Sequence, residues 1–414
     1  MKNDEEAVKV SKNYWIRVVI IFFLGWILMY GTRTIFNPIM GIVGKQFGLN
    51  NTQLGLANSI FFLTYAVFQV PFGALGDKYG RKLVITIGFL VLAVMSWLSG
   101  IAASFTLFLI IRALAGVGQA SYYGPQYALS SEAIPEDKLT LGTAIINSGM
   151  AFGTSGGYLL SSYLVLQNHQ SWKVPFFVVA VPTAILAVLF YTCLKEKVYR
   201  PKKAEKVSEN QPKEKVSLKK IFTNKNLVAA FVLCFCSIYA NFVIITWLPS
   251  FLISNRGFEG GSVGFISSLV PWASIPGALV FAKLADKTGS TKKWIYLLVP
   301  LSIISVFAIA FVSNKVLLIA VLILYGLTGK LAIDPIIVAY VTKKAPSGSL
   351  STTLSAYNFI GMSGSILAPY ITGWLADVTG QMEIGFYLGC GLLIIGLIVF
   401  AVLATDSKKG ETAV

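Results

Sequence analysis

The stretch Gly73-Ala74-Leu75-Gly76-Asp77-Lys78-Tyr79-Gly80-Arg81-Lys82 is a short charged turn between two long apolar segments. The flanking segments, residues 53–75 and 83–103, are each long enough to cross a bilayer, because about 20 helical residues span roughly 30 Å of hydrocarbon. A related turn, Ala285-Asp286-Lys287-Thr288-Gly289-Ser290, begins after another apolar segment, and its aspartate lies 209 residues beyond Asp77. The turn therefore predicts a membrane protein built from two related halves.

The composition agrees with a chain that lies mostly in lipid. Of its 414 residues, 55% are hydrophobic and 13% are charged, whereas about 25% of an ordinary soluble domain is charged. The apolar segments predict an all-α integral membrane fold with 12 transmembrane helices in two six-helix halves. The predicted helices cover residues 16–39, 53–75, 83–103, 106–130, 139–165, 174–194, 227–254, 261–282, 294–313, 316–342, 350–375 and 384–405.

Two further landmarks repeat at nearly the same offset. Pro125 recurs as Pro335 after 210 residues, and Asn147 recurs as Asn358 after 211. Three landmarks at one spacing indicate an internal duplication. Parallel repeats of this kind place a substrate site near the bilayer midplane where the halves meet, so we expect one there.

Basic residues indicate a linker and an orientation. Residues 195–225 hold eleven Lys or Arg against four acids, which predicts a cytoplasmic linker between an N-terminal bundle, 1–194, and a C-terminal bundle, 226–414. With both termini in the cytoplasm, four of the 34 basic residues fall in outer loops, three fall deep inside predicted spans, and the remaining 27 are cytoplasmic. Positively charged loops stay inside, so we expect a multi-pass protein of the plasma membrane.

Several other classes of protein are excluded. The net charge of +16 is spread over short loops between apolar segments, which argues against a nucleic-acid partner. The sequence has no phosphate-cradling loop, no metal-ligand spacing and no nucleophile constellation. All four cysteines lie in apolar segments. We therefore expect no enzyme activity, no cofactor and no metal, and a monomer in the lipid bilayer.

Four charged residues fall deep inside predicted spans, namely Arg33, Arg112, Lys330 and Asp334. Charges at membrane depth are costly and mark function by default. Three cations against one anion favour a small anionic substrate, because an Arg fork binds carboxylate or phosphate. In the alternative interpretation, Lys330 and Asp334 neutralise each other across one helix turn and both arginines are structural. Asp334 is the candidate for binding a coupling proton, and a counter-ion stays possible.

Polar and aromatic residues on the same helices complete the candidate substrate site. With the three cations, the predicted substrate-binding set is Tyr30, Arg33, Asn37, Arg112, Gln119, Tyr123, Gln126, Tyr239, Asn241, Lys330 and Asn358.

The turn at 73–82 resembles the signature loop of the major facilitator superfamily. The resemblance implies that a glycine in the loop lets helices pack closely. It also implies that an aspartate and an arginine tie cytoplasmic helix ends together in the outward-open state. The implied gating residues are Gly73, Asp77, Gly80, Arg81 and Asp286. In that superfamily the first, fourth, seventh and tenth helices line the central cavity, and all four intramembrane charges fall on these helices.

Within the superfamily, the chain looks most like the anion:cation symporter branch, which includes sialin-like, hexuronate and sugar-acid carriers. The resemblance rests on Tyr30-Gly31-Thr32-Arg33, on Thr246-Trp247-Leu248-Pro249-Ser250-Phe251-Leu252, and on residues 361–369. The branch usually has an aspartate where this chain has Thr32 and a glutamate where it has Gln119. Those acids serve proton coupling in the branch. Either Asp334 takes that role here, or the protein exchanges or facilitates.

The sequence thus predicts a secondary active transporter that moves a carboxylate or sugar acid by alternating access. A lipid or drug exporter is an alternative, because residues 116–122 also resemble spinster-type lipid carriers. An organophosphate antiporter is another, although the arginine that such proteins have in the seventh helix is missing from residues 227–255. A transporter-like sensor is disfavoured, because the N-terminal segment and the tail after Asp406 are too short to fold as a signalling domain.

Overall fold

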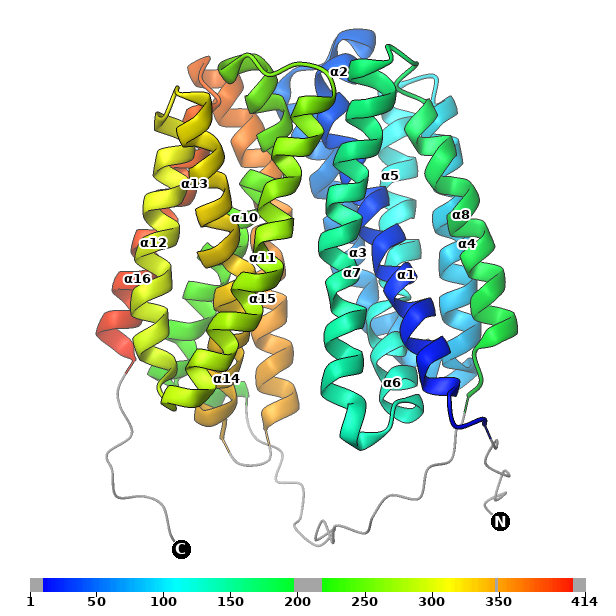
Figure 1. The fold of residues 1–414 in the computed structure, drawn as a ribbon, viewed down its shortest axis with the longest axis vertical. Helices are drawn as coiled ribbons and strands as arrows, with labels where there is room; N and C mark the ends of the chain where they lie inside the picture. Colours follow the sequence, from blue (N-terminus) through cyan, green and yellow to red (C-terminus); the bar gives the residue numbers. More distant parts are fainter. Residues whose placement is uncertain (1–9, 197–217, 347–348, 405–414) are drawn as a thin grey trace, which may run out of the picture. The chain divides into compact units, whose positions relative to one another are not determined.

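The computed structural model describes residues 10–196, 218–346 and 349–404, and the regular structure in these ranges is helical throughout (Figure 1). The all-α prediction is therefore confirmed. The chain divides into two compact units, Met1–Glu209 with Pro249–Ser268, and Asn210–Leu248 with Leu269–Val414. Most of the predicted linker, residues 197–217, lies outside the described residues, so the predicted bundle boundaries stay a prediction.

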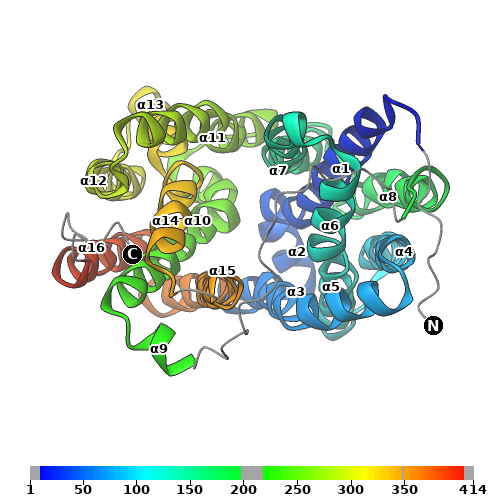
Figure 2. The ribbon, with the colours of Figure 1, turned by 90° about the horizontal axis from the view of Figure 1, so that it is seen from below.

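The first unit packs its long helices in pairs. Figure 2 shows α1 beside α7 and α4 beside α8, and α3 packs along α5. Its elements are α1 (Tyr14–Thr34), η1 (Asn37–Ile39), α2 (Met40–Phe47), α3 (Asn51–Tyr79), α4 (Arg81–Ile101), α5 (Phe105–Ala120), α6 (Tyr123–Ala133), η2 (Glu136–Lys138), α7 (Leu139–Ser161), the π-helix η3 (Ser162–Gln167) and α8 (Val174–Cys193).

The second unit surrounds a buried apolar core, with α12 packed against α13, α14 and α16. The long helices α10 and α11 contribute their ends nearest residues 249–268 to the first unit. The elements are α9 (Leu218–Phe222), α10 (Lys225–Arg256), α11 (Gly261–Thr288), α12 (Thr291–Phe311), α13 (Lys315–Thr328), α14 (Lys330–Lys344), α15 (Leu350–Thr379) and α16 (Glu383–Leu403).

Eleven helical stretches in the described residues are long and apolar enough to cross a membrane. The remaining predicted span corresponds to α7, which has 23 residues and no charge but contains five glycines and six Ser or Thr. These small and polar residues lower its hydropathy, and they also let α7 approach α1. A Cβ atom on Gly153 would lie 2.9 Å from the Cα atom of Ile27. Hydropathy alone therefore underestimates the ability of α7 to span the membrane, because its small residues serve close packing.

The predicted fourth helix, 106–130, is broken in the structure between α5 and α6. Pro125 has no N–H to donate to the carbonyl of Ser121, so a regular helix cannot pass this point without losing a hydrogen bond. The chain tightens there, with Tyr122 N donating to Gln119 O at 3.1 Å, and the helix restarts with Gln126 N donating to Tyr122 O at 2.9 Å. The break places Gln119 at the end of one helix and Tyr123 at the start of the next.

The predicted tenth helix, 316–342, is also broken, but at Gly329, between α13 and α14, and Pro335 lies inside α14. Gly329 donates its N–H to Tyr325 O at 2.7 Å and then turns to an extended ψ of −158°. A Cβ atom at position 329 would lie 2.5 Å from that carbonyl oxygen, so a side chain cannot be fitted without movement. The helix restarts at Lys330, which places Lys330 and Asp334 in the first turns of α14. Broken helices of this kind carry the binding sites of many transporters.

Candidate functional site

Arg33 is one of two buried arginines in the first unit. Only 5% of the residue is exposed, and its Nε donates to Gln119 Oε1 at 2.6 Å. The guanidinium lies over the rings of Tyr30 and Tyr65, at 4.6 and 4.4 Å from their centroids. The Nη2 atom is buried and has no hydrogen-bond partner among the described residues. No described carboxylate lies within 4.0 Å of the group.

The neighbours of Arg33 form a neutral hydrogen-bond network. Gln119 is fully buried and its Nε2 donates to Met29 O at 2.9 Å and to Thr32 Oγ1 at 2.8 Å. Thr32 in turn donates to Met29 O at 2.8 Å. Both N–H bonds of the Gln119 amide are therefore used, and its oxygen must face Arg33. At the two positions where the symporter branch usually carries acids, this chain has groups that cannot ionise near neutral pH.

Arg112 is also buried, with 2% exposed, but its partners are different. Its Nη2 donates to Asn58 Oδ1 at 2.8 Å and its Nε to Ala57 O at 3.4 Å. Asn58 Nδ2 donates onward to Asn37 Oδ1 at 3.1 Å, so two of the predicted substrate-binding residues are joined through a third that was not predicted. This arrangement agrees with a structural role for Arg112, because a side-chain amide oxygen and a backbone oxygen of α3 accept its hydrogen bonds. Both arginines lie over the ring of Phe61.

An aromatic group surrounds the break between α5 and α6. The Trp26 ring lies 5.1 Å from that of Tyr122 and 6.2 Å from that of Tyr123. Tyr122 is buried and donates to Phe22 O at 2.7 Å, whereas Tyr123 is 39% exposed. Gln126 follows one turn later, with Nε2 on Ser130 Oγ at 3.2 Å. Its Oε1 and Trp26 Nε1 are buried without a hydrogen-bond partner in the described residues.

The second unit holds a separate ionisable cluster on α14 and α15. Lys330 Nζ lies 3.3 Å from Asp334 Oδ2. Tyr357 Oη donates to Asp334 Oδ1 at 2.6 Å. The lysine and aspartate side chains are only 19% and 30% exposed. The predicted i, i+4 relation of Lys330 and Asp334 is thus an ion pair, and Tyr357 is a third member that was not predicted.

The other predicted residues of the second unit do not join this cluster. Tyr239 and Asn241 are buried on α10, and the Tyr239 ring packs 6.2 Å from that of Phe235. Asn358 is exposed, although the adjacent Tyr357 is buried.

The charged turn at 73–82 ties three helices of the first unit together. Arg81 Nη2 lies 3.1 Å from Asp77 Oδ1, and Nη1 pairs with Glu132 at the end of α6. Gly80 has a φ of 104°, a left-handed conformation that glycine adopts without strain. The carboxylate of Glu196 accepts the Lys82 N–H after the turn.

The glycine that permits close approach in this turn is Gly76, where a Cβ atom would lie 3.2 Å from Pro125 Cγ. A Cβ atom on Gly73 would meet nothing within 4 Å. In the repeat of the turn, Asp286 is exposed and forms no ion pair with a described residue. The position four residues after Asp286 is Ser290, which caps α12, so this copy of the turn lacks the arginine.

Four partners of the predicted site residues were missed by sequence reasoning: Asn58, Tyr65, Glu132 and Tyr357. Asn58 and Tyr65 are seven residues apart on α3, and polar side chains at that spacing share one face of an apolar helix, which was a usable signal. The other two partners are identified only by the packing of distant helices.

Comparisons with known proteins agree with this architecture. Residues 22–369 match the family model described as Major Facilitator Superfamily. The chain is 28% identical over 405 residues to the hexuronate transporter of Bacillus subtilis (strain 168), which covers 94% of this chain and 93% of that protein. It is 26% identical over 347 residues to the sialic acid transporter NanX of Escherichia coli (strain K12), covering 81% and 82% of the two chains.

The fold is also that of a solved structure. A bacterial homologue of the human lysosomal transporter Spinster superposes with a TM-score of 0.78 at 16% identity, covering 95% of this chain and 96% of that one. The similarity to hexuronate and sialic acid transporters confirms the resemblance to the anion:cation symporter branch. The family model covers most of the chain, so this multi-pass membrane protein belongs to the Major Facilitator Superfamily, a family of secondary transporters and not of enzymes.

Proposed function

We propose that this transporter moves a small organic anion and that Arg33 binds its negative charge. The observation that carries the proposal is the unbalanced charge of Arg33. The side chain is buried, one of its donors has no hydrogen-bond partner and no described carboxylate neutralises it. A buried arginine without a counter-charge is costly. An anionic substrate would supply both the missing charge and the missing acceptor.

The chemistry of the site favours a carboxylate over other anions. A guanidinium can bind a carboxylate through parallel hydrogen bonds, and Nη2 of Arg33 is a donor without a hydrogen-bond partner among the described residues. The rings of Tyr30 and Tyr65 stabilise the cation without neutralising it. The relatives named for hexuronate and sialic acid transport both have carboxylate substrates. A carboxylate or sugar acid is therefore the proposed substrate.

The proposed mechanism is alternating access in the plasma membrane, with both termini in the cytoplasm. The orientation rests on the 27 basic residues of the cytoplasmic segments, out of 34 in the chain. The Arg81 ion pairs with Asp77 and Glu132 hold the ends of α3, α4 and α6 together and can break as helices separate. This turn is the proposed gate.

Substrate binding to purified Arg33 variants tests the proposal. Thermal shift with a panel of organic acids, sugar phosphates and lipids identifies ligands of the wild-type protein, because ligand stabilisation grows with concentration relative to Kd. Arg33→Ala should abolish the shift caused by the carboxylate ligand. Arg33→Lys should weaken it, because an ammonium cannot form the bidentate pair.

Arg112→Lys is the matched control, because Arg112 is equally buried but satisfied by Asn58 and a backbone carbonyl. This variant should lower the melting temperature of the ligand-free protein and leave the affinity for the carboxylate ligand nearly unchanged. Unchanged binding in both Arg33 variants, or stabilisation by lipids alone, would overturn the anion proposal.

A further inference from the structure

Asp334 has an unusual position among the carboxylates of the described spans. Six carboxylates fall within the eleven candidate spans, and all except Asp334 lie within two residues of a span end. Asp334 lies ten residues inside the span Lys315–Lys344. An ionisable group at such depth is energetically costly, which makes it a candidate functional group.

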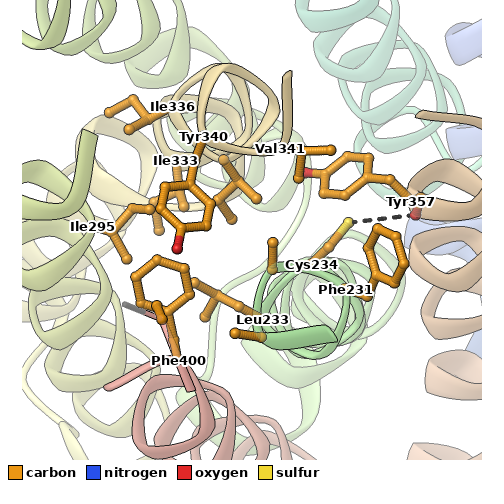
Figure 3. Close-up of a cluster of buried hydrophobic side chains, with 14 of the residues drawn as sticks. Phe231, Leu233, Cys234, Ile295, Ile333, Ile336, Tyr340, Val341, Tyr357 and Phe400 are labelled. Atoms are coloured by element: carbon orange, nitrogen blue, oxygen red, sulfur yellow. Dashed lines mark hydrogen bonds between the residues drawn. The ribbon is translucent and has the colours of Figure 1, made fainter. Parts of the chain in front are cut away.

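The partners of Asp334 hold each oxygen of its carboxylate. Lys330 approaches Oδ2 at 3.3 Å and Tyr357 Oη donates to Oδ1 at 2.6 Å. Tyr357 belongs to the buried core of the second unit, and Cys234 Sγ donates to its backbone oxygen at 3.9 Å, the contact drawn in Figure 3. Among the described residues, the titratable groups that face Asp334 are Lys330 on α14, Tyr357 on α15 and Cys234 on α10.

The described spans of the first unit hold no carboxylate at a comparable depth. Thr32 and Gln119 occupy the positions beside Arg33, and the donors of both are used within a neutral network. Neither can take up a proton and release it near neutral pH. A proton that drives anion uptake must therefore bind elsewhere, and the deep carboxylate of the second unit is the available acceptor.

We infer that Asp334 binds the coupling proton of this transporter, with Tyr357 and Lys330 as positioning residues for its carboxylate. The inference rests on the proposed anion transport. In the step, the Asp334 carboxylate accepts one proton from the side of higher proton concentration and becomes a neutral carboxylic acid. After the conformational change it releases that proton on the other side. Lys330 stays protonated, so the charge of the pair alternates between zero and +1.

One titrating carboxylate implies one proton in each cycle. For a monovalent anion the combined cargo is neutral, and uptake should respond to a pH gradient but not to membrane potential. A divalent anion carried with one proton would make uptake electrogenic.

Proteoliposomes separate the coupling role from substrate binding. Two activities are measured with the ligand that stabilises the wild-type protein: accumulation driven by an imposed pH gradient, and exchange of labelled for unlabelled substrate without a gradient. Asp334→Asn should lose gradient-driven accumulation and keep exchange. Arg33→Ala should lose both. Accumulation by Asp334→Asn at the wild-type level would overturn the inference and leave the proposed function standing, whereas full activity of Arg33→Ala would reject the proposed function itself.

Tyr357→Phe tests whether Tyr357 positions the carboxylate of Asp334. Replacing a residue with a purely structural role would not move the pH profile. The phenol donates to the ionised carboxylate, so its loss should move the midpoint of the pH profile of accumulation toward alkaline pH. Tyr340→Phe is the matched control, because Tyr340 lies in the same core and donates to Asn226 instead, at 2.7 Å. An unmoved midpoint in Tyr357→Phe, or an equal shift in both variants, would refute the positioning role.

Discussion

Replacing Gln119 with glutamate places a carboxylate against the cation that we propose to bind substrate. The Gln119 oxygen already accepts from Arg33 Nε at 2.6 Å, so Gln119→Glu introduces a negative charge without changing the size of the side chain. The variant also loses two donated hydrogen bonds, to Met29 O and to Thr32 Oγ1, which the amide makes in the wild-type protein. Substrate and the new carboxylate would then compete for one guanidinium.

The size of the effect follows from the separation of the charges. Two unit charges about 4 Å apart interact with roughly 4 kcal/mol at an effective dielectric constant of about 20. Cancelling that attraction would cost the anion nearly a thousandfold in affinity. The anion would retain a hydrogen bond to Nη2 of Arg33, which has no partner among the described residues, so we expect a loss of roughly a hundredfold, about 2.7 kcal/mol. Because protonation removes the introduced charge, part of the affinity should return as the pH falls.

Equilibrium binding to detergent-purified protein at several pH values measures this effect. Gln119→Met removes the same hydrogen bonds without adding charge and serves as the control. It should lose less affinity and show no additional recovery at low pH. Equal losses in the two variants would refute the electrostatic argument, because the hydrogen bonds of Gln119 would then account for the whole effect. An unchanged affinity in Gln119→Glu would remove Arg33 from the substrate site.

Three further predictions concern packing, the helix break and the gate. Gly118→Ala puts a Cβ atom 2.8 Å from a backbone oxygen of α4 and should destabilise the protein by about 1–3 kcal/mol in thermal melting. The control is Gly156→Ala, whose Cβ atom would meet nothing within 4 Å. This variant should be neutral or slightly stabilising. Gly329→Ala collides with the carbonyl oxygen four residues earlier and should lower the melting temperature more than Gly156→Ala does. Arg81→Ala breaks two ion pairs and should lower the maximal uptake rate roughly fivefold without changing Kd. Asp286→Ala, measured in the same uptake and binding assays, should change neither the uptake rate nor Kd.

Much of the fold could be predicted because its signals are local. Apolar runs long enough to cross a bilayer give the helices directly, and a charged turn such as 73–82 is visible at once between them. Intramembrane charges are rare enough to identify by position alone, which is why Arg33, Lys330 and Asp334 were all predicted as site residues. The helix α7 was predicted as well, although glycine, serine and threonine leave it less apolar than the other spans.

The partners of these charges could not be predicted, because they depend on how each helix is rotated. Successive residues of a helix point about 100° apart, so an error of one position changes the face. The repeat drew attention to Asn358, which is exposed, whereas the side chain that reaches Asp334 is that of Tyr357. Glu132 pairs with Arg81 across 51 residues of sequence, a relation that no local pattern records.

The roles proposed for Arg33 and Asp334 would separate substrate binding in one repeat from proton coupling in the other. A carboxylate beside Arg33 would neutralise the arginine unless it were protonated, and anion binding would then depend on pH in the first unit itself. Thr32 and Gln119 remove that dependence, because their network around Arg33 is neutral at every physiological pH. The second unit carries the reverse arrangement, an acid held by Lys330 and Tyr357. Binding of an ionised substrate should therefore vary little with pH while its accumulation varies strongly, and this difference distinguishes the present arrangement from one in which acid and arginine share a site.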